Sequence, residues 1–201
     1  MTHEATQISI LESQIEHALL RARKQEGIYG HNTGHFTLQV EKENTVIGVL
    51  GELLVRDFLN NFAISYGSNT RIELTDFGFH TDLISVESGG KRARGIHVKT
   101  GLWQNWPKDH FEFGIHADQR IERSQNPLVL VSLLKNLAGW PITGRIEGYI
   151  SASTLMNAKI IKRGDSFPST GIISRTNNLV TRIDQYQKME TLAKHLFENS
   201  L

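Results

Sequence analysis

The chain contains, from Phe79 to Trp103, the stretch FHTDLISVESGGKRARGIHVKTGLW, which decides the fold. Residues Gly78 to Val86 are rich in the β-branched and aromatic side chains that favour a strand. Ser88 to Gly90 tolerate positive φ angles and predict a turn. Residues Gly95 to Trp103 alternate in polarity, which is typical of a second strand. The stretch therefore predicts a β-hairpin.

This hairpin carries the candidate chemical groups. His97 and Lys99 lie two residues apart and share one face of the second strand, whereas Ile96 and Val98 point to the other face. A hairpin places the positions of its two strands side by side, so Asp82 of the first strand can meet this face. We therefore expect an acid and a lysine in one small volume.

Length and composition limit the protein class. With 201 residues the chain suits one domain, in which we expect an N-terminal helical extension (1–43), a core (44–150) and C-terminal elements (151–201). The absence of cysteine excludes disulfides, thiolate zinc sites and a cysteine nucleophile. Lys+Arg 22 against Asp+Glu 21 give a net charge of +1, so any basic surface must be local. The sequence has no uncharged apolar run of membrane-spanning length, which predicts a soluble, cytoplasmic protein without a membrane partner.

Two amphipathic helices are expected before the hairpin. Residues Ile8 to Gln25 repeat apolar side chains at intervals of three and four, and this helix packs on the domain or on a second copy of the chain. Residues Asn44 to Phe62 carry a wider apolar stripe and predict a buried helix. Gly48 and Gly51 on this helix would allow another backbone to come close. Glu52 lies near the stripe, where a carboxylate must reach solvent or meet a cation.

The rest of the chain predicts further strands and short helices. Strands are expected at Arg71 to Leu74, Phe111 to Ile115, Leu128 to Leu134 and Arg145 to Ile150, with those at Phe111 and Leu128 completing one sheet with the hairpin. Helices are expected at Asp118 to Ser124, from an N-cap at Ser151 through Asn157, and from about Thr181 to Phe197.

Other polar and aromatic residues give weaker signals. His31 and His35 are four apart, but the glycines around them favour loop histidines over a metal site. Trp103 and Trp106 follow the second strand, where they either stack on unpaired bases or belong to the core. Five cations in the last part of the chain either bind a row of nucleic-acid phosphates or keep a surface soluble, and their number alone favours the second role. They are Lys159, Lys162, Arg163, Arg175 and Arg182.

The order of these elements resembles the PD-(D/E)xK nuclease superfamily, which has the restriction-endonuclease-like fold. The likeness spans Val46 to Ile150 and depends on the motifs GELLVRDFL, FHTDLISV and GIHVKTG. It implies an α/β fold with a central mixed β-sheet flanked by helices. It also implies a Mg²⁺- or Mn²⁺-dependent DNA endonuclease of a prokaryote or phage. A homodimer of such an enzyme would cut both strands of the DNA.

The resemblance also implies roles for individual residues. Asp82 and Glu52 match the family's metal-ligating acids, and the backbone carbonyl of Val98 completes the coordination. Lys99 matches the lysine that activates water and offsets negative charge on the phosphate. A second set of residues is expected to contact nucleic acid, comprising Lys91, Arg92 and Arg94 of the hairpin turn and Gln119 of the following helix.

The family pattern has Glu, Asp or Gln where this chain has His97. Imidazole is a softer ligand than carboxylate and adds no negative charge. Three interpretations follow: His97 is a neutral metal ligand that favours Mn²⁺, it is a general base near neutral pH, or the site binds nucleic acid without cutting.

Each site residue also has a purely structural interpretation. Asp82 can end a strand, Lys99 can be a surface lysine with a buried stem, and Glu52 can form a surface salt bridge. Two other functions follow from these alternatives. One is a catalytically inactive nucleic-acid-binding module of the same fold, and the other is a structural or interaction protein.

Overall fold

The structure is a computed structural model that describes residues 5–25, 38–76, 81–87, 90, 92–117 and 125–197. The elements follow one another as β1 (Thr6–Ser9), α1 (Glu12–Gln25), α2 (Leu38–Ser65), β2 (Arg71–Leu74), β3 (Leu83–Val86), β4 (Arg92–Trp103), β5 (Glu112–His116), β6 (Leu128–Leu134), β7 (Thr143–Ile150), α3 (Ala152–Met156), β8 (Lys159–Ile161), β9 (Asn178–Arg182), the 3₁₀ helix η3 (Ile183–Gln185) and α4 (Met189–Phe197). The chain is thus an α/β protein, as its sequence predicts.

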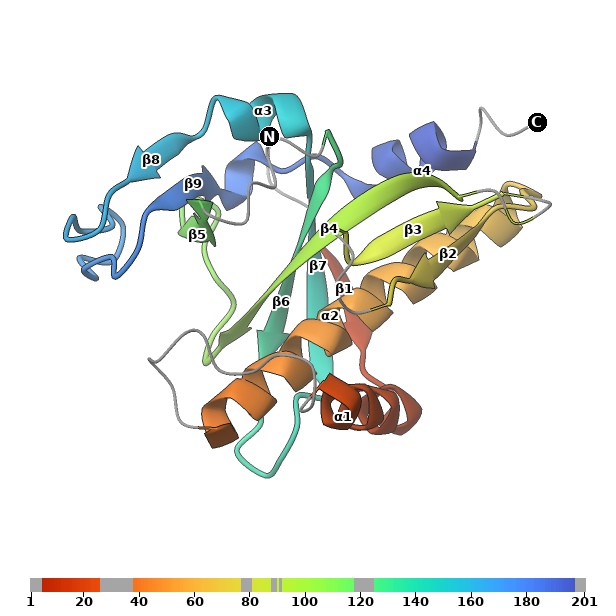
Figure 1. Cartoon of the computed structure of the whole chain (residues 1–201), viewed down its shortest axis with the longest axis horizontal. Helices are drawn as coiled ribbons and strands as arrows, with labels where there is room; N and C mark the ends of the chain where they lie inside the picture. The colour runs from red at the N-terminus through yellow and green to blue at the C-terminus, as the bar shows by residue number, and fades with distance from the viewer. Residues whose placement is uncertain are drawn as a thin grey trace.

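Six strands form a mixed main sheet in the order β1-β7-β6-β4-β3-β2. The predicted hairpin is confirmed, because β3 pairs antiparallel with β4 and Leu83 lies opposite Ile96. A bulge between Ile84 and Val86 shifts the register toward the turn. On its other side β4 pairs parallel with β6, which requires the long crossover through β5. Figure 1 shows α2 running in nearly the same direction as β2, β3 and β4 and diagonally to β6 and β7.

The two faces of β6 belong to two separate hydrophobic clusters. Val129, Val131 and Leu133 join the cluster that contains the buried residues of α1, α2 and α4. Leu128 and Leu130 join the cluster formed with the three-stranded sheet β5-β9-β8 and with α3. The alternation explains why this strand is apolar throughout, since helices cover one face and the small sheet covers the other.

The helix α2 approaches β4 very closely at Gly51. A Cβ atom at Gly51 would lie 1.9 Å from the hydroxyl of Thr100, whereas a Cβ at Gly48 would have no neighbour within 4 Å. Of the two glycines expected to permit a close approach, Gly51 does so. Its missing side chain fixes the distance between α2 and β4.

Gly51→Ala is expected to destabilise the protein by about 1 to 3 kcal/mol, because the added methyl must push α2 away from β4. Gly48→Ala is the matched control and is expected to stabilise the helix by about 0.5 to 1 kcal/mol. Urea denaturation measures both effects, and the additional change Thr100→Ala should restore most of the loss. Equal stability of the two alanine variants would contradict this account of the packing.

Several predicted elements are confirmed with their bounds. The strands at Arg71–Leu74 and Leu128–Leu134 are β2 and β6, and the buried helix is α2, which extends beyond the predicted ends. The boundary expected at residues 43 and 44 therefore falls inside α2. Ser151 caps α3, since its hydroxyl accepts from the N–H of Thr154, and Asn157 is the C-cap.

Three predictions of secondary structure or sheet membership were wrong. Ile8 lies in the edge strand β1, paired with Gly144 of β7, so the first helix begins only at Glu12. The strand expected at Phe111 is β5, but it pairs with β9 in the small sheet and not with the hairpin. The last helix begins at Met189, because Thr181 and Arg182 end β9, Ile183–Gln185 form the 3₁₀ helix η3, and Gln187 exchanges backbone hydrogen bonds with Tyr149.

Three further predictions concern the packing of the first helix, a segment outside the described residues, and membrane-spanning helices. Ala18 and Ala22 of α1 are buried in the same cluster as α2, so α1 packs on its own domain. The helix expected at Asp118 to Ser124 and the histidines His31 and His35 lie outside the described residues. None of the described helices combines the length and the apolar character needed to cross a membrane.

Candidate active site

The backbone around Asp82 is held by the strands on both sides of it. Asp82 precedes the first residue of β3, and its N–H donates to the carbonyl of Ile96 on β4 at 3.2 Å. Its own carbonyl accepts from the N–H of Thr75, just after β2, at 3.1 Å. The strand predicted over Gly78 to Val86 therefore begins later, at Leu83, and the aspartate sits at the strand end, where its type is tolerated.

The carboxylate of Asp82 takes the place of a missing strand partner. Val98 lies beyond Ile96, the last residue of β4 that is paired with β3. Its N–H donates to Oδ2 of Asp82 at 2.7 Å. Because the N–H and C=O of one strand residue point to the same side, the carbonyl of Val98 also points toward this edge. Asp82 and the Val98 carbonyl thus present oxygen atoms at one place.

His97 is buried directly beside this carboxylate. Its Nδ1 lies 3.9 Å from Oδ2 of Asp82, which is longer than a hydrogen bond, and its side chain is only 7% exposed. Its backbone N–H donates to the carbonyl of Pro127 at 2.9 Å. The structure therefore brings His97 and Asp82 together, with the imidazole in a dry environment.

Lys99 belongs to the same group of charges. It is partly buried, and burial lowers the pKa of Lys99 while the nearby charge of Asp82 raises it. In turn, burial raises the pKa of Asp82, and the Val98 N–H and the charge of Lys99 oppose that rise. The two residues predicted to meet are therefore electrostatic neighbours.

Glu52 reaches the same group from α2. Burial, and then the negative charge of Asp82, raise the pKa of Glu52 from its ordinary value of 4.5 to about 8, while the charge of Arg21 lowers it. A surface salt bridge would not raise the pKa of a carboxyl group. Glu52 is thus a largely buried acid whose charge interacts with that of Asp82.

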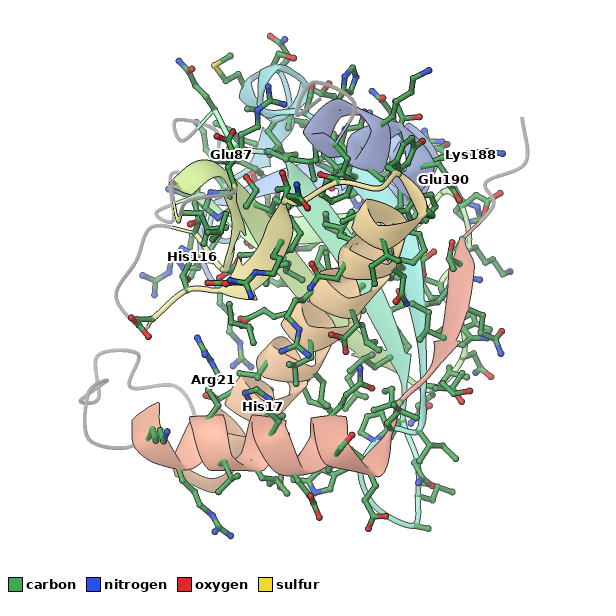
Figure 2. The ribbon with its side chains drawn as sticks, turned by 90° about the vertical axis from the view of Figure 1, so that its right-hand side faces the viewer. His17, Arg21, Glu87, His116, Lys188 and Glu190 are labelled. Carbon is green, nitrogen blue, oxygen red and sulfur yellow. The ribbon has the colours of Figure 1, made fainter. Side chains whose placement is uncertain are left out.

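Arg21 of α1 is a neighbour of the site that the sequence analysis did not single out. Its Nη2 donates to the carbonyl of Thr75, the residue whose N–H holds Asp82. Figure 2 shows Arg21 and His17 pointing from α1 toward the body of the domain. Arg21 follows the buried Ala18 by three residues and precedes the buried Ala22, so helical spacing places it on the buried side of α1. That spacing was the available signal.

Of the four residues predicted to contact nucleic acid, the structure describes the side chain of Arg94. The Nη1 of Arg94 donates to the carbonyl of His195 in the last turn of α4, at 3.0 Å, so Arg94 connects the hairpin to that helix. Arg92 begins β4, and its side chain lies outside the description, as do Lys91 and Gln119.

The two tryptophans have structural contacts. The ring of Trp103 packs edge-on against Phe111, with centroids 4.7 Å apart, and belongs to the second hydrophobic cluster. The guanidinium of Arg145 lies 5.0 Å from the ring centre of Trp106. Trp103 is therefore a core residue, which was one of its two sequence interpretations.

The donor set at the site suits a hard cation that keeps most of its water. Within the described ranges, no three His, Asp or Glu side chains are grouped to hold a metal ion. Asp82, Glu52 and the Val98 carbonyl nevertheless supply two carboxylates and one neutral oxygen. Mg²⁺ usually binds through one or two carboxylates and several waters, so this set fits it without a further side-chain ligand.

Comparisons of this chain with protein-family models, with curated proteins and with solved structures found no match.

Proposed function

We propose that the protein is a Mg²⁺- or Mn²⁺-dependent deoxyribonuclease of the restriction-endonuclease-like fold, acting as an endonuclease. The observation that carries the proposal is the electrostatic interaction of Asp82 with both Glu52 and Lys99, at the carboxylate that accepts from the N–H of Val98. Two acids and a lysine with lowered pKa, joined across a hairpin and a helix, supply the charges that phosphodiester hydrolysis needs. The mixed sheet with helices on one face supports the fold assignment.

In this proposal the chain's own groups divide the work. Asp82, Glu52 and the Val98 carbonyl would hold the cation, which would make water more acidic and withdraw charge from the phosphate. The ammonium of Lys99 orients the attacking water and offsets the charge of the pentavalent phosphate. The water oxygen forms a bond to phosphorus and releases a proton to solvent, while the bond to the leaving sugar oxygen breaks and that oxygen takes up a proton from solvent.

His97 stands where the family has a carboxylate or amide, and this position supports a second candidate function. The buried imidazole adds no negative charge, and the described acids form no three-ligand group. A catalytically inactive nucleic-acid-binding module of the same fold is therefore the alternative. Salt-sensitive DNA binding without cleavage in any divalent metal would identify it.

Purified protein is expected to nick and linearise supercoiled plasmid in Mn²⁺ or Mg²⁺ and to leave it intact in EDTA. Circular plasmid has no ends, so its cleavage also separates endonuclease from exonuclease action. Protein with Asp82→Asn, purified in the same way, controls for a contaminating nuclease. Intact plasmid in both metals, across a range of pH and salt, would refute the nuclease proposal. Size-exclusion chromatography with light scattering tests the accompanying proposal of a homodimer.

A further inference from the structure

The strands β8 and β9 and the loop between them form a basic hairpin at one end of the molecule. Figure 1 shows β8 and β9 at the left, extending beyond the main sheet. Four exposed cations lie in β8 and in the loop before β9, namely Lys159, Lys162, Arg163 and Arg175, called here the hairpin cations. Asp165 is the one acid between the first and the last of them.

Backbone hydrogen bonds pair the segments of the loop that carry Arg163 and Arg175. The N–H of Gly164 donates to the carbonyl of Ser174 at 2.8 Å, so the neighbours of these two residues, Arg163 and Arg175, are on facing sides of the hairpin. The N–H of Arg163 donates to Oδ1 of Asn177 at 3.0 Å, and the N–H of Ser174 donates to the carbonyl of Asp165 at 2.8 Å. These hydrogen bonds fix the backbone that carries Arg163 and Arg175.

Among the described residues, no acid forms an ion pair with these charges. Across the ranges that the structure describes, the ion pairs do not involve the hairpin cations, whereas neighbouring Arg182 is paired with Asp184. Residues 159–177 carry a net charge of +3, and the whole chain carries +1, so the remainder is net negative. Positive potential is therefore concentrated on this hairpin.

The small sheet that carries the hairpin covers the same face of the main sheet as Lys99. His97 and Lys99 of β4 lie opposite Leu128 and Leu130 of β6 in a parallel pair, so all four side chains point to one face. Leu128 and Leu130 pack in the cluster that contains Leu179 of β9. A long polyanion that reaches Lys99 therefore approaches from the side on which the hairpin lies.

From this placement we propose that the hairpin cations bind the phosphate backbone of duplex DNA beside the site of Asp82 and Lys99. The inference rests on the proposed function for the identity of the polymer. Lysine and arginine contacts to phosphates position a duplex without reading its sequence. The hairpin thus supplies affinity and orientation, and Lys99 supplies chemistry.

The test compares two triple variants with the same loss of charge. One carries Lys162→Gln, Arg163→Gln and Arg175→Gln, and the control carries Arg23→Gln, Lys108→Gln and Lys135→Gln, all at exposed positions. Fluorescence anisotropy with a labelled 30-base-pair duplex, in Ca²⁺ or EDTA to prevent cleavage, gives Kd from 50 to 200 mM salt. The hairpin variant is expected to bind about tenfold or more weakly at 100 mM salt. Its slope of log K against log salt should be smaller by about 2 to 3, as expected for three lost phosphate contacts.

Equal affinities and slopes for the two variants, or no binding of wild-type protein to the duplex at 50 mM salt, would overturn the proposal. The plasmid assay separates this failure from that of the nuclease. Cleavage by wild-type protein with no effect of the hairpin variant on binding rejects only the hairpin surface. Binding that depends on the hairpin without cleavage rejects only the nuclease. Circular dichroism melting of both triple variants excludes unfolding as the cause of weaker binding.

Discussion

The variant Asp82→Asn is expected to lose at least about a thousandfold in the rate of plasmid cleavage while keeping its fold. The amide oxygen can still accept the hydrogen bond from the N–H of Val98, so the hairpin keeps its main connection to this residue. The substitution removes one of the two carboxylates that would hold a cation, together with the negative charge that raises the pKa of Lys99 against the effect of burial. Initial rates in Mn²⁺ measure the effect.

Asp109→Asn is the control for this experiment. Asp109 is exposed and uses its backbone carbonyl to accept from the N–H of Asp184, so loss of its charge should leave the rate unchanged. If the Asp82 variant cuts plasmid within tenfold of the wild-type rate, the site described here is not the site of cleavage.

Glu52→Gln is expected to stabilise the metal-free protein at alkaline pH by up to about 5 kcal/mol. The folded protein retains the proton of Glu52 until pH of about 8, because its pKa is raised to that value, whereas the unfolded chain releases it near 4.5. The free energy of unfolding therefore falls as the pH rises from about 4.5 to 8. Glutamine is neutral throughout and does not carry this cost. Below the ordinary pKa, wild-type and variant should have the same stability.

Thermal melting in EDTA from pH 5 to pH 9 measures this difference, with Glu190→Gln at an exposed position as the control. The Tm of the Glu52 variant should exceed that of wild-type increasingly above pH 6, and the control should follow wild-type. Addition of Mn²⁺ at pH 9 should raise the Tm of wild-type protein and not that of the Glu52 variant. A Tm difference that is constant with pH would show that Glu52 is not held neutral by its surroundings.

Local patterns in the sequence were sufficient to predict most elements but not their partners. Alternation identifies Phe111 to Ile115 as strand-like, yet it does not specify whether β5 joins the hairpin or β9. Pairing across more than sixty residues depends on which apolar faces remain uncovered after the main sheet forms, namely Leu128 and Leu130. The short strand β1 was missed because Ile8 fits both the helical spacing and an edge strand.

In the candidate site too, local sequence patterns predicted some neighbours, whereas contacts between distant elements were not predicted. The sequence predicted that Asp82, His97 and Lys99 meet, because hairpin geometry and strand alternation are local rules. Arg21 was not predicted as a neighbour of Glu52, since this depends on how α1 lies against α2. Arg94 was assigned to nucleic acid, yet it donates to a carbonyl 101 residues away in α4, a contact that no sequence pattern contains.

The bulge between Ile84 and Val86 lies between the turn of the hairpin and the residues of the candidate site. The part of β4 that contains Val98 and Lys99 is held by its parallel pairing with β6 and by the hydrogen bond from Val98 to the carboxylate of Asp82. The side next to the turn follows a different register, because the bulge absorbs one extra residue there. Insertions or deletions between Glu87 and Arg92 are therefore expected to leave the arrangement of Asp82, Val98 and Lys99 in place, so this segment can diverge in length and composition during evolution.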